Sequence, residues 1–230
     1  EQFRRHFAQL GITEVDFFPA ARADDLPPVG PGTRVLLAQP YLSDTVSALC
    51  KRGAKLVSAP YPLGVEGTLA WFQAAAAEWG YSAEAVKEAL AIPMARAQKS
   101  LAKIRESLRG RTIHFLPDSQ LEIPLARFLR DECYMSLTEV ATPYLDQTLM
   151  AEELRRLGRG VSLVEGSDLD SALARVRDYR PDLTVCGMGI ANPLEAEGLR
   201  TKWSIELIFT PIQGFDQVAD LAGLFARPLV

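Results

Sequence analysis

Residues 183–198 read Leu-Thr-Val-Cys-Gly-Met-Gly-Ile-Ala-Asn-Pro-Leu-Glu-Ala-Glu-Gly, and Thr-Lys-Trp-Ser-Ile-Glu-Leu-Ile-Phe follows at residues 201–209. The first four residues predict a buried strand, since a short apolar run that ends at glycine is typical of a parallel sheet covered on both faces. Residues 192–198 predict a polar loop after that strand. Ligand sites of open α/β sheets lie outside the carboxyl ends of strands, so we expect a site here.

Strands and helices alternate along the chain before this stretch. Apolar runs predict strands at residues 15–18, 34–38, 55–58, 112–116, 137–141 and 161–164, and helical segments lie between most of them. Ser119 and Glu122 predict a capping box, and Ser167 or Asp168 is expected to cap the helix that follows. This spacing predicts parallel, right-handed βαβ units.

The fold class is therefore α/β, with two Rossmann-like parallel-sheet domains. We assign residues 1–80 to a first domain, residues 81–109 to a long connecting helix kinked at Pro93, and residues 110–230 to a second domain that carries the stretch quoted above. The chain lacks an initiating Met and opens in a predicted helix, so we expect the first domain to be truncated at its N-terminal side.

Bulk composition excludes several classes of protein. The 230 residues are 48% hydrophobic and 23% charged with a net charge of −4, which favours a folded chain and argues against a general nucleic-acid surface. No apolar run is long enough for a membrane span, and the sequence starts without a signal peptide. Three cysteines without CxxC spacing indicate free thiols in a reducing, cytoplasmic compartment.

Few residues are candidates for chemistry. Cys50 and Cys133 are expected to be small buried side chains, and packing is also favoured for Cys186 and for His114 in its apolar strand. The Cys and His residues are too scattered for a metal site. Gly187-x-Gly189 lacks the third glycine and the following helix of a dinucleotide fingerprint, and no P-loop or GxSxG motif is present.

The aromatic side chains of residues 203–209 allow two interpretations. In a strand, Trp203, Ile205, Leu207 and Phe209 would share one face, because side chains alternate with period 2. Composition favours a core strand. The same face would also suit a flat organic ligand, since such pockets are mostly apolar with a few polar anchors.

Three motifs carry a resemblance to a known family. Residues 182–198 with 201–206, residues 118–128 (Asp-Ser-Gln-Leu-Glu-Ile-Pro-Leu-Ala-Arg-Phe) and residues 62–68 (Pro-Leu-Gly-Val-Glu-Gly-Thr) resemble the C-terminal portion of subunit N of light-independent (dark-operative) protochlorophyllide reductase. The resemblance covers essentially the whole chain. It implies a fold of the nitrogenase component 1 type.

The resemblance also implies an activity and partners. The N and B subunits of this family form an N2B2 heterotetramer that holds a [4Fe-4S] cluster, and an ATP-hydrolysing iron–sulfur subunit L delivers electrons. The C17=C18 double bond of ring D of protochlorophyllide is reduced to give chlorophyllide a in (bacterio)chlorophyll biosynthesis. The family's cluster cysteines and proton donor match no residue here, so no catalytic residue and no metal ligand is assigned. The compartment would be the cytoplasm, or the stroma in a plastid-bearing organism.

The resemblance does imply ligand-binding residues, which would form a wall of a tetrapyrrole site. Trp203 and Phe209 match the family's aromatics, with Ile205 and Leu207 as secondary candidates. A regular strand would separate the two aromatics by about 20 Å, so the segment must bend or the ligand must lie along it. Gln213 stands where related subunits often keep a histidine, and an amide is a poor ligand for a transition metal.

Two other interpretations remain open. The chain could be a non-catalytic α/β binding or scaffold protein that shares only the fold. It could also belong to chlorophyllide reductase or to a nitrogenase-like subunit, although the Asn-Pro-Leu-Glu-Ala run and Gln213 favour subunit N over both.

Overall fold

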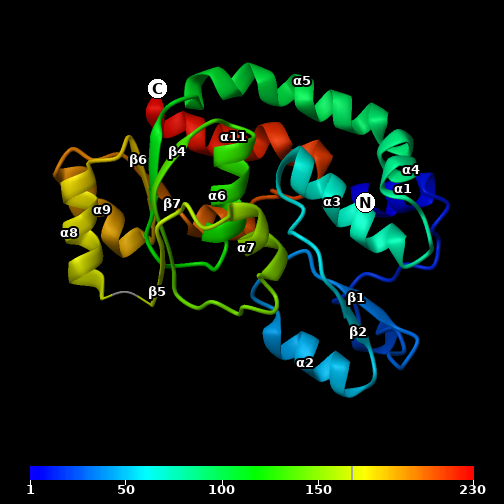
Figure 1. Cartoon of the computed structure of the whole chain (residues 1–230). Coiled ribbons are helices and arrows are strands. Elements are labelled where there is room, and N and C mark those ends of the chain that lie inside the picture. The colour runs from blue at the N-terminus through cyan, green and yellow to red at the C-terminus, as the bar shows by residue number, and fades with distance from the viewer. Residues whose placement is uncertain (167) are drawn as a thin grey trace.

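The strands of the second half of the chain form a five-stranded parallel sheet. The computed structural model describes residues 1–166 and 168–230. This sheet has the order β5-β4-β3-β6-β7, and a smaller sheet pairs β1 with β2 in parallel (Figure 1). The strands are β1 (Arg34–Leu36), β2 (Lys55–Val57), β3 (Thr112–Phe115), β4 (Ser136–Thr142), β5 (Leu163–Glu165), β6 (Leu183–Cys186) and β7 (Thr201–Trp203). The predicted α/β class with parallel sheets is confirmed.

The strand order of the larger sheet creates a topological switch point. The chain starts at β3 in the centre, moves outward to β4 and β5, and then returns to β6 on the other side of β3. The loops that leave β3 and β6 therefore diverge to opposite faces. In open α/β sheets, ligands bind in the crevice formed at such a point, outside the carboxyl ends of the strands.

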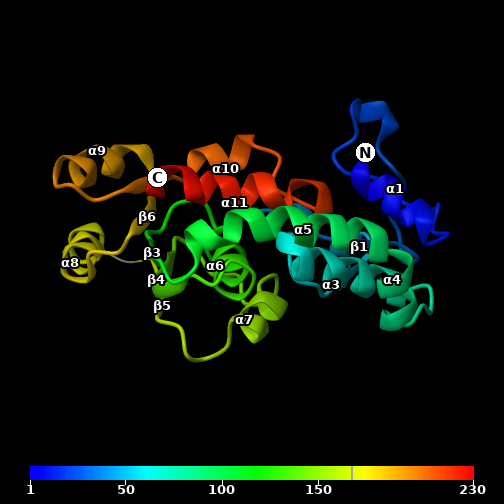
Figure 2. The ribbon, with the colours of Figure 1, turned by 90° about the horizontal axis from the view of Figure 1, so that it is seen from above.

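Helices connect the strands and cover the sheets. They are α1 (Gln2–Gln9), α2 (Ser43–Lys51), α3 (Gly64–Ala77), α4 (Ala83–Ala89), α5 (Ala91–Leu108), α6 (Glu122–Asp131), α7 (Ala151–Leu157), α8 (Leu169–Tyr179), α9 (Met188–Ala196), α10 (Ile205–Phe209) and α11 (Val218–Ala226). The last helix, α11, returns to lie along α5 (Figure 2). The chain therefore closes on the helix that precedes the larger sheet.

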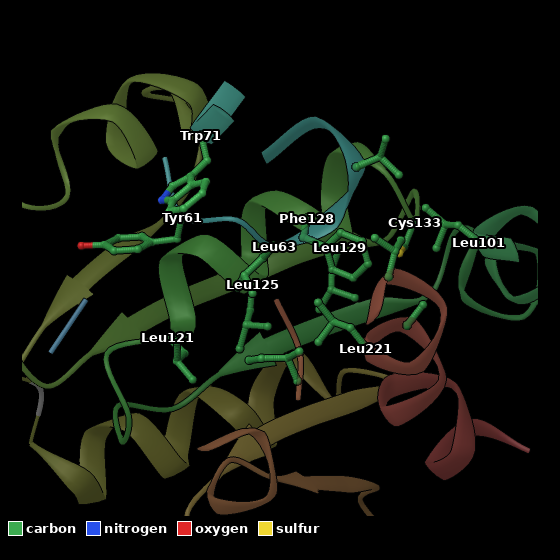
Figure 3. Close-up of a cluster of buried hydrophobic side chains, with 14 of the residues drawn as sticks. Tyr61, Leu63, Trp71, Leu101, Leu121, Leu125, Phe128, Leu129, Cys133 and Leu221 are labelled. Atoms are coloured by element: carbon green, nitrogen blue, oxygen red, sulfur yellow. The ribbon is translucent and has the colours of Figure 1, made fainter. Parts of the chain in front are cut away.

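One apolar cluster joins the two sheets. Figure 3 shows Tyr61, Leu63 and Trp71 from the β2–α3 region at one end of this cluster and Leu101 of α5 at the other, with Phe128 of α6 and Leu221 of α11 between them. Phe128, Leu101 and Leu221 are fully buried. Burial of each such side chain contributes roughly 1.5–3 kcal/mol, so this core holds both halves of the chain together.

Three predicted elements that precede β7 differ in kind from the structure. The long connecting helix is two helices that part at Leu90, because Pro93 would remove the N–H that a continuous helix needs and would crowd the carbonyl of Ala89. Residues 15–18 form no strand within the described chain. Residues 192–198 are not a loop: most of them belong to α9, with Pro193 inside the helix.

The helix caps that the sequence predicts for α6 and α8 can be located in the structure. Asp168 caps α8, where its carboxylate accepts from the Ser171 N–H at 3.2 Å, while Ser167 lies outside the described residues. The capping box is half formed. The Glu122 carboxylate accepts from the Ser119 N–H at 2.6 Å, but the Ser119 hydroxyl accepts from Leu121.

Candidate functional site

The carboxyl ends of three neighbouring strands meet at the switch point. Asp118 follows β3, Gly187 follows β6, and Ser204 follows β7. The Ser204 hydroxyl donates to Asp118 Oδ2, and the Ser204 N–H donates to the carbonyl of Cys186 at 3.0 Å. The Asp118 side chain thus reaches past the end of β6, which lies between β3 and β7.

Gly187 leaves room for this contact. A Cβ at position 187 would lie 2.9 Å from Asp118 Oδ1, which is closer than real Cβ atoms approach an oxygen. Gly187 is also the N-cap of α9 and has an extended backbone. The expectation that no helix follows Gly187-x-Gly189 was therefore wrong, although the third glycine of the fingerprint is still missing.

A buried carboxylate fixes the turn that carries Asp118. Glu122 accepts hydrogen bonds from the N–H of Asp118 at 3.0 Å and of Ser119 at 2.6 Å, and from the Thr142 hydroxyl at 3.1 Å. Burial raises the pKa of Glu122, and these donors act in the opposite direction. The turn after β3 is therefore tied to the end of β4.

Residues 203–209 do not form the continuous strand that their alternation predicted. β7 ends at Trp203, and α10 begins at Ile205. In a helix, residues four apart share a side, so Ile205 and Phe209 lie together while Leu207 points the other way. Leu207 is accordingly 1% exposed and belongs to the core, whereas Phe209 is 80% exposed. The predicted single face of four apolar residues was wrong.

The bend shortens the segment. A helix advances about 1.5 Å per residue, against about 3.3 Å in a strand, so Trp203 and Phe209 lie much closer than the strand interpretation required. Trp203 is half-buried and packs against a cluster made by Leu116, Ala172, Val176, Cys186, Ala191, Leu194 and Leu199. Ile205 is half-buried.

Exposed apolar side chains follow two neighbouring strands of the sheet, β6 and β7. Met188, the first residue after Gly187, is 53% exposed, and Ile208 and Phe209 follow β7 with 40% and 80% exposure. Alternation and motif spacing did not reveal Met188 as part of the edge, because its place depends on the switch point between β3 and β6. Together with Trp203, these residues form what we call the apolar edge: Met188, Trp203, Ile208 and Phe209. Ligands of open α/β sheets bind at such a switch point, so these side chains are candidates for a binding surface.

The cysteines do not fit an iron–sulfur cluster. Cys186 and Cys133 are fully buried, and burial raises the pKa of Cys186 to about 12 and raises that of Cys133 as well. A cluster needs thiolates, which these environments disfavour. Within residues 1–166 and 168–230, no group of three or more His, Cys, Asp or Glu side chains could hold a metal ion. Cys50 is exposed, so its predicted burial was wrong.

Gln213 is occupied in a structural role. Its Nε2 donates to the carbonyl of Ala38 at 2.7 Å, and its own carbonyl accepts from Gln2 Nε2 at 2.7 Å. The next N–H, that of Gly214, donates to the carbonyl of Pro62 at 2.8 Å. The turn after α10 is therefore attached both to the smaller sheet and to α1.

A cavity of about 460 Å³ lies away from the apolar edge. It is bounded by β1, α2 and α3, with Trp71 and Trp79 among its lining residues, and no residue of the 203–209 segment takes part. The apolar edge coincides with the switch point of the larger sheet, whereas the cavity lies beside the smaller sheet. The cavity supplies a natural control, because it offers a second tryptophan-lined surface.

The sequence matches the profile of the family described as Nitrogenase component 1 type Oxidoreductase over residues 1–229. The chain belongs to this family. Two solved structures titled "Nitrogenase Cp1 at pH 5" and "Nitrogenase Cp1 at pH 6.5" share the fold, with TM-scores of 0.60 and 0.58. Each covers 76% of this chain, at 15% and 13% sequence identity, while the chain covers 41% and 44% of them. The predicted nitrogenase component 1 type of fold is thus confirmed.

Curated relatives within the nitrogenase component 1 type are much more similar. Proteins named light-independent protochlorophyllide reductase subunit N from Halorhodospira halophila (strain DSM 244 / SL1) and Rhodopseudomonas palustris (strain TIE-1) are 60% and 57% identical over 230 residues. Both alignments cover 100% of this chain and 54% of the relative, so the chain spans about half the length of the curated relatives it matches. None of the described helices has both the length and the apolar character that crossing a bilayer requires.

Proposed function

We propose that this chain forms part of subunit N of a light-independent protochlorophyllide reductase and supplies one wall of the tetrapyrrole site. The observation that carries the proposal is the 57–60% identity to relatives of that name across the whole chain. At such identity, a shared fold and a shared ligand class are the simplest interpretation. The exposed apolar side chains at the switch point support the proposed position of the wall.

The proposed reaction adds two electrons and two protons to the C17=C18 double bond of ring D, which becomes a single bond. The electrons would come from an ATP-hydrolysing iron–sulfur subunit L, through a [4Fe-4S] cluster that the N and B subunits share in an N2B2 complex. The described residues do not fit such a cluster, so its ligands would lie outside them. This chain's part is to bind and orient the macrocycle in the cytoplasm, while neighbouring subunits supply electrons.

Phe209 and Trp203 are the proposed contacts. A tetrapyrrole is flat and largely apolar, and aromatic rings pack against such surfaces in offset or edge-on arrangements. Phe209 is 80% exposed, and covering a side chain of that size contributes roughly 1.5–3 kcal/mol. Ile205 would flank the ligand on the same side of α10, and Leu207 would act only by holding α10 to the core.

The test is pigment binding by the complete N2B2 complex. Trp203→Ala and Phe209→Ala complexes, titrated anaerobically with protochlorophyllide and followed by absorbance, should bind the pigment roughly tenfold more weakly, a loss of about 1.4 kcal/mol. Their iron–sulfur absorbance should stay unchanged. Trp79→Ala, in the lining of the 460 Å³ cavity, is the matched control and should bind normally.

Other outcomes would favour other functions. Normal affinity in both wall variants, or a loss confined to Trp79→Ala, would contradict the wall. Tighter binding of chlorophyllide than of protochlorophyllide would indicate the sister enzyme, chlorophyllide reductase. A full-length protein that purifies without iron, without pigment and without a second subunit would indicate a scaffold protein.

A further inference from the structure

The Asp118–Ser204 hydrogen bond joins the turn after β3 to the middle of the proposed wall. Ser204 is the residue between Trp203 and α10, so its position sets the direction in which the segment leaves the sheet. Ser204 is 1% exposed, while Asp118 is exposed at the edge. A buried hydroxyl therefore meets a carboxylate that is open to solvent on its other side.

The hydroxyl has a single proton and two acceptors within reach. Ser204 Oγ lies 3.1 Å from the Cys186 carbonyl and is also bonded to Asp118 Oδ2. The Cys186 carbonyl already accepts the Ser204 N–H at 3.0 Å. A hydrogen bond to a carboxylate is stronger than one to a neutral carbonyl, so the proton points to Asp118.

Asp118 is itself held in place. Its N–H donates to the buried Glu122 carboxylate at 3.0 Å, and its Oδ1 occupies the space that a side chain at position 187 would need. The carboxylate is thus fixed by the β3–α6 turn before it meets Ser204. The hydrogen bonds that join Glu122 to Asp118 and Asp118 to Ser204 thus connect the centre of the sheet to its β7 side, where the wall begins.

We propose that Asp118 is a positioning residue of the tetrapyrrole site, which acts through Ser204 to orient Trp203 and α10 toward the ligand. This inference rests on the proposed function, because it assumes that the wall binds pigment. It assigns Asp118 no proton transfer and no contact with the macrocycle. Without the carboxylate, the Ser204 hydroxyl turns to the Cys186 carbonyl, and the link from β3 to α10 is lost.

A double-mutant cycle in the full N2B2 complex tests the assignment. Asp118→Ala and Ser204→Ala should each weaken protochlorophyllide binding roughly tenfold, the change expected when one charge-assisted hydrogen bond is removed. The double variant should be no weaker than either single variant, because both remove the same contact. Asp118→Asn should restore near-normal affinity, since its amide oxygen still accepts the hydroxyl proton. Asp178→Ala, an exposed aspartate on α8, is the control and should bind normally.

The outcomes separate this inference from the proposed function. A loss in Asp118→Ala without a loss in Ser204→Ala would mean that the carboxylate meets the ligand directly and would overturn the inference. Additive losses, or normal affinity in both variants, would overturn it too. If Trp203→Ala binds weakly while Asp118→Ala binds normally, only the positioning role fails. If Trp203→Ala and Phe209→Ala also bind normally, the wall itself fails. Iron absorbance and thermal unfolding of every variant show whether the complex stays assembled.

Discussion

Arg127 and Glu153 form a buried ion pair, with Arg127 Nε 2.6 Å from Glu153 Oε2 and Nη2 3.3 Å from Oε1. The pair links α6 to α7, and its remaining contacts reach the loop after β2. Arg127 Nη2 also donates to the carbonyls of Tyr61 and Leu63, and the Tyr61 N–H donates to Glu153 Oε1 at 2.7 Å. The pair therefore connects the smaller sheet to the larger one.

Glu153→Gln should destabilise the chain strongly. Removing one charge leaves the Arg127 guanidinium buried with only Glu132, at 3.7 Å, as a carboxylate neighbour. Breaking a buried pair in this way costs about 3–5 kcal/mol of the free energy of unfolding. Urea denaturation followed by far-UV circular dichroism would measure the loss. The adjacent Glu152 pairs with Arg155 at the surface, so Glu152→Gln is the matched control and should unfold like the parent chain. Equal stability of the two variants would contradict the role assigned to the buried pair.

Gly64→Ala should be more harmful than the same change at Gly80. Both glycines have left-handed backbones, with φ of +76° and +79°. A Cβ at position 64 would lie 2.1 Å from Glu132 Oε1 and 2.4 Å from Phe128 Cδ2, whereas position 80 is open. We expect a loss of about 1–2 kcal/mol at Gly80 from backbone strain, and roughly 2 kcal/mol more at Gly64 from the clash. Chemical denaturation of the two variants compares them, and similar midpoints would contradict the account of the β2–α3 loop.

His114 should make stability fall as the pH is lowered. The Thr138 hydroxyl donates to the Ile113 carbonyl at 3.2 Å, so it accepts the Nδ1–H of a neutral His114 ring at 3.0 Å. Nε2 is buried without a partner, 3.6 Å from a Glu139 oxygen that is already bonded to Arg175. Burial lowers the pKa of His114 from 6.5 to about 4, against the attraction of Glu139. Between pH 4 and pH 6.5, the unfolded chain therefore binds a proton at His114 that the folded chain does not bind.

Because the unfolded chain binds the extra proton, the free energy of unfolding falls as the pH is lowered. The contribution of neutral His114 is fully present above pH 6.5 and is lost as the pH falls toward 4, by about 3 kcal/mol in all. The change is best measured as the difference between the parent chain and His114→Phe in urea at pH 7 and pH 5. Glu122 and Glu132 have raised pKa values and act in the opposite direction, but they cancel in that difference. A difference that does not change with pH would contradict a buried neutral histidine.

Leu207→Ala and Phe209→Ala should separate stability from pigment binding. Leu207 is 1% exposed, and truncating a buried leucine costs about 2–5 kcal/mol. Phe209 is 80% exposed, so its truncation should leave the unfolding midpoint nearly unchanged while pigment affinity falls. Thermal unfolding of the chain and pigment titration of the complex measure the two effects. A destabilised Phe209→Ala with normal pigment affinity would reverse the assignments of the two residues.

Much of the larger sheet could be predicted from sequence because its central strands are unusually clear. Residues 112–116 and Leu183–Cys186 are short apolar runs with turn residues after them, and both became strands within one residue of the prediction. The capping contacts of Glu122 and Asp168 were also recognisable, since they depend on residues three apart. These strands and caps could be predicted because they depend on residues that are close together in the sequence.

The candidate site was harder to predict because the apolar residues at 203–209 fit both the period of a strand and the period of a helix. Trp203, Ile205, Leu207 and Phe209 alternate as in a strand, yet Ile205 and Phe209 also stand four apart, which fits one side of a helix, and α10 spans these two residues. Pro193 and Gly198 similarly suggested a loop where α9 forms. The Asp118–Ser204 contact joins residues 86 positions apart, so only the strand order could reveal it.

The attachment of α1 to the turn after α10 has a consequence for the order of folding. Gln2 bonds to Gln213, and Arg5 forms an ion pair with Asp216 at 2.7 Å; in both cases 211 positions separate the partners. During synthesis, α1 cannot make these contacts until Gln213 and Asp216 have left the ribosome. Such distant contacts slow folding, because a long loop must close before they form. In a pulse-labelling hydrogen-exchange experiment, the amides of α1 should therefore gain protection late, after those of β3 and β6.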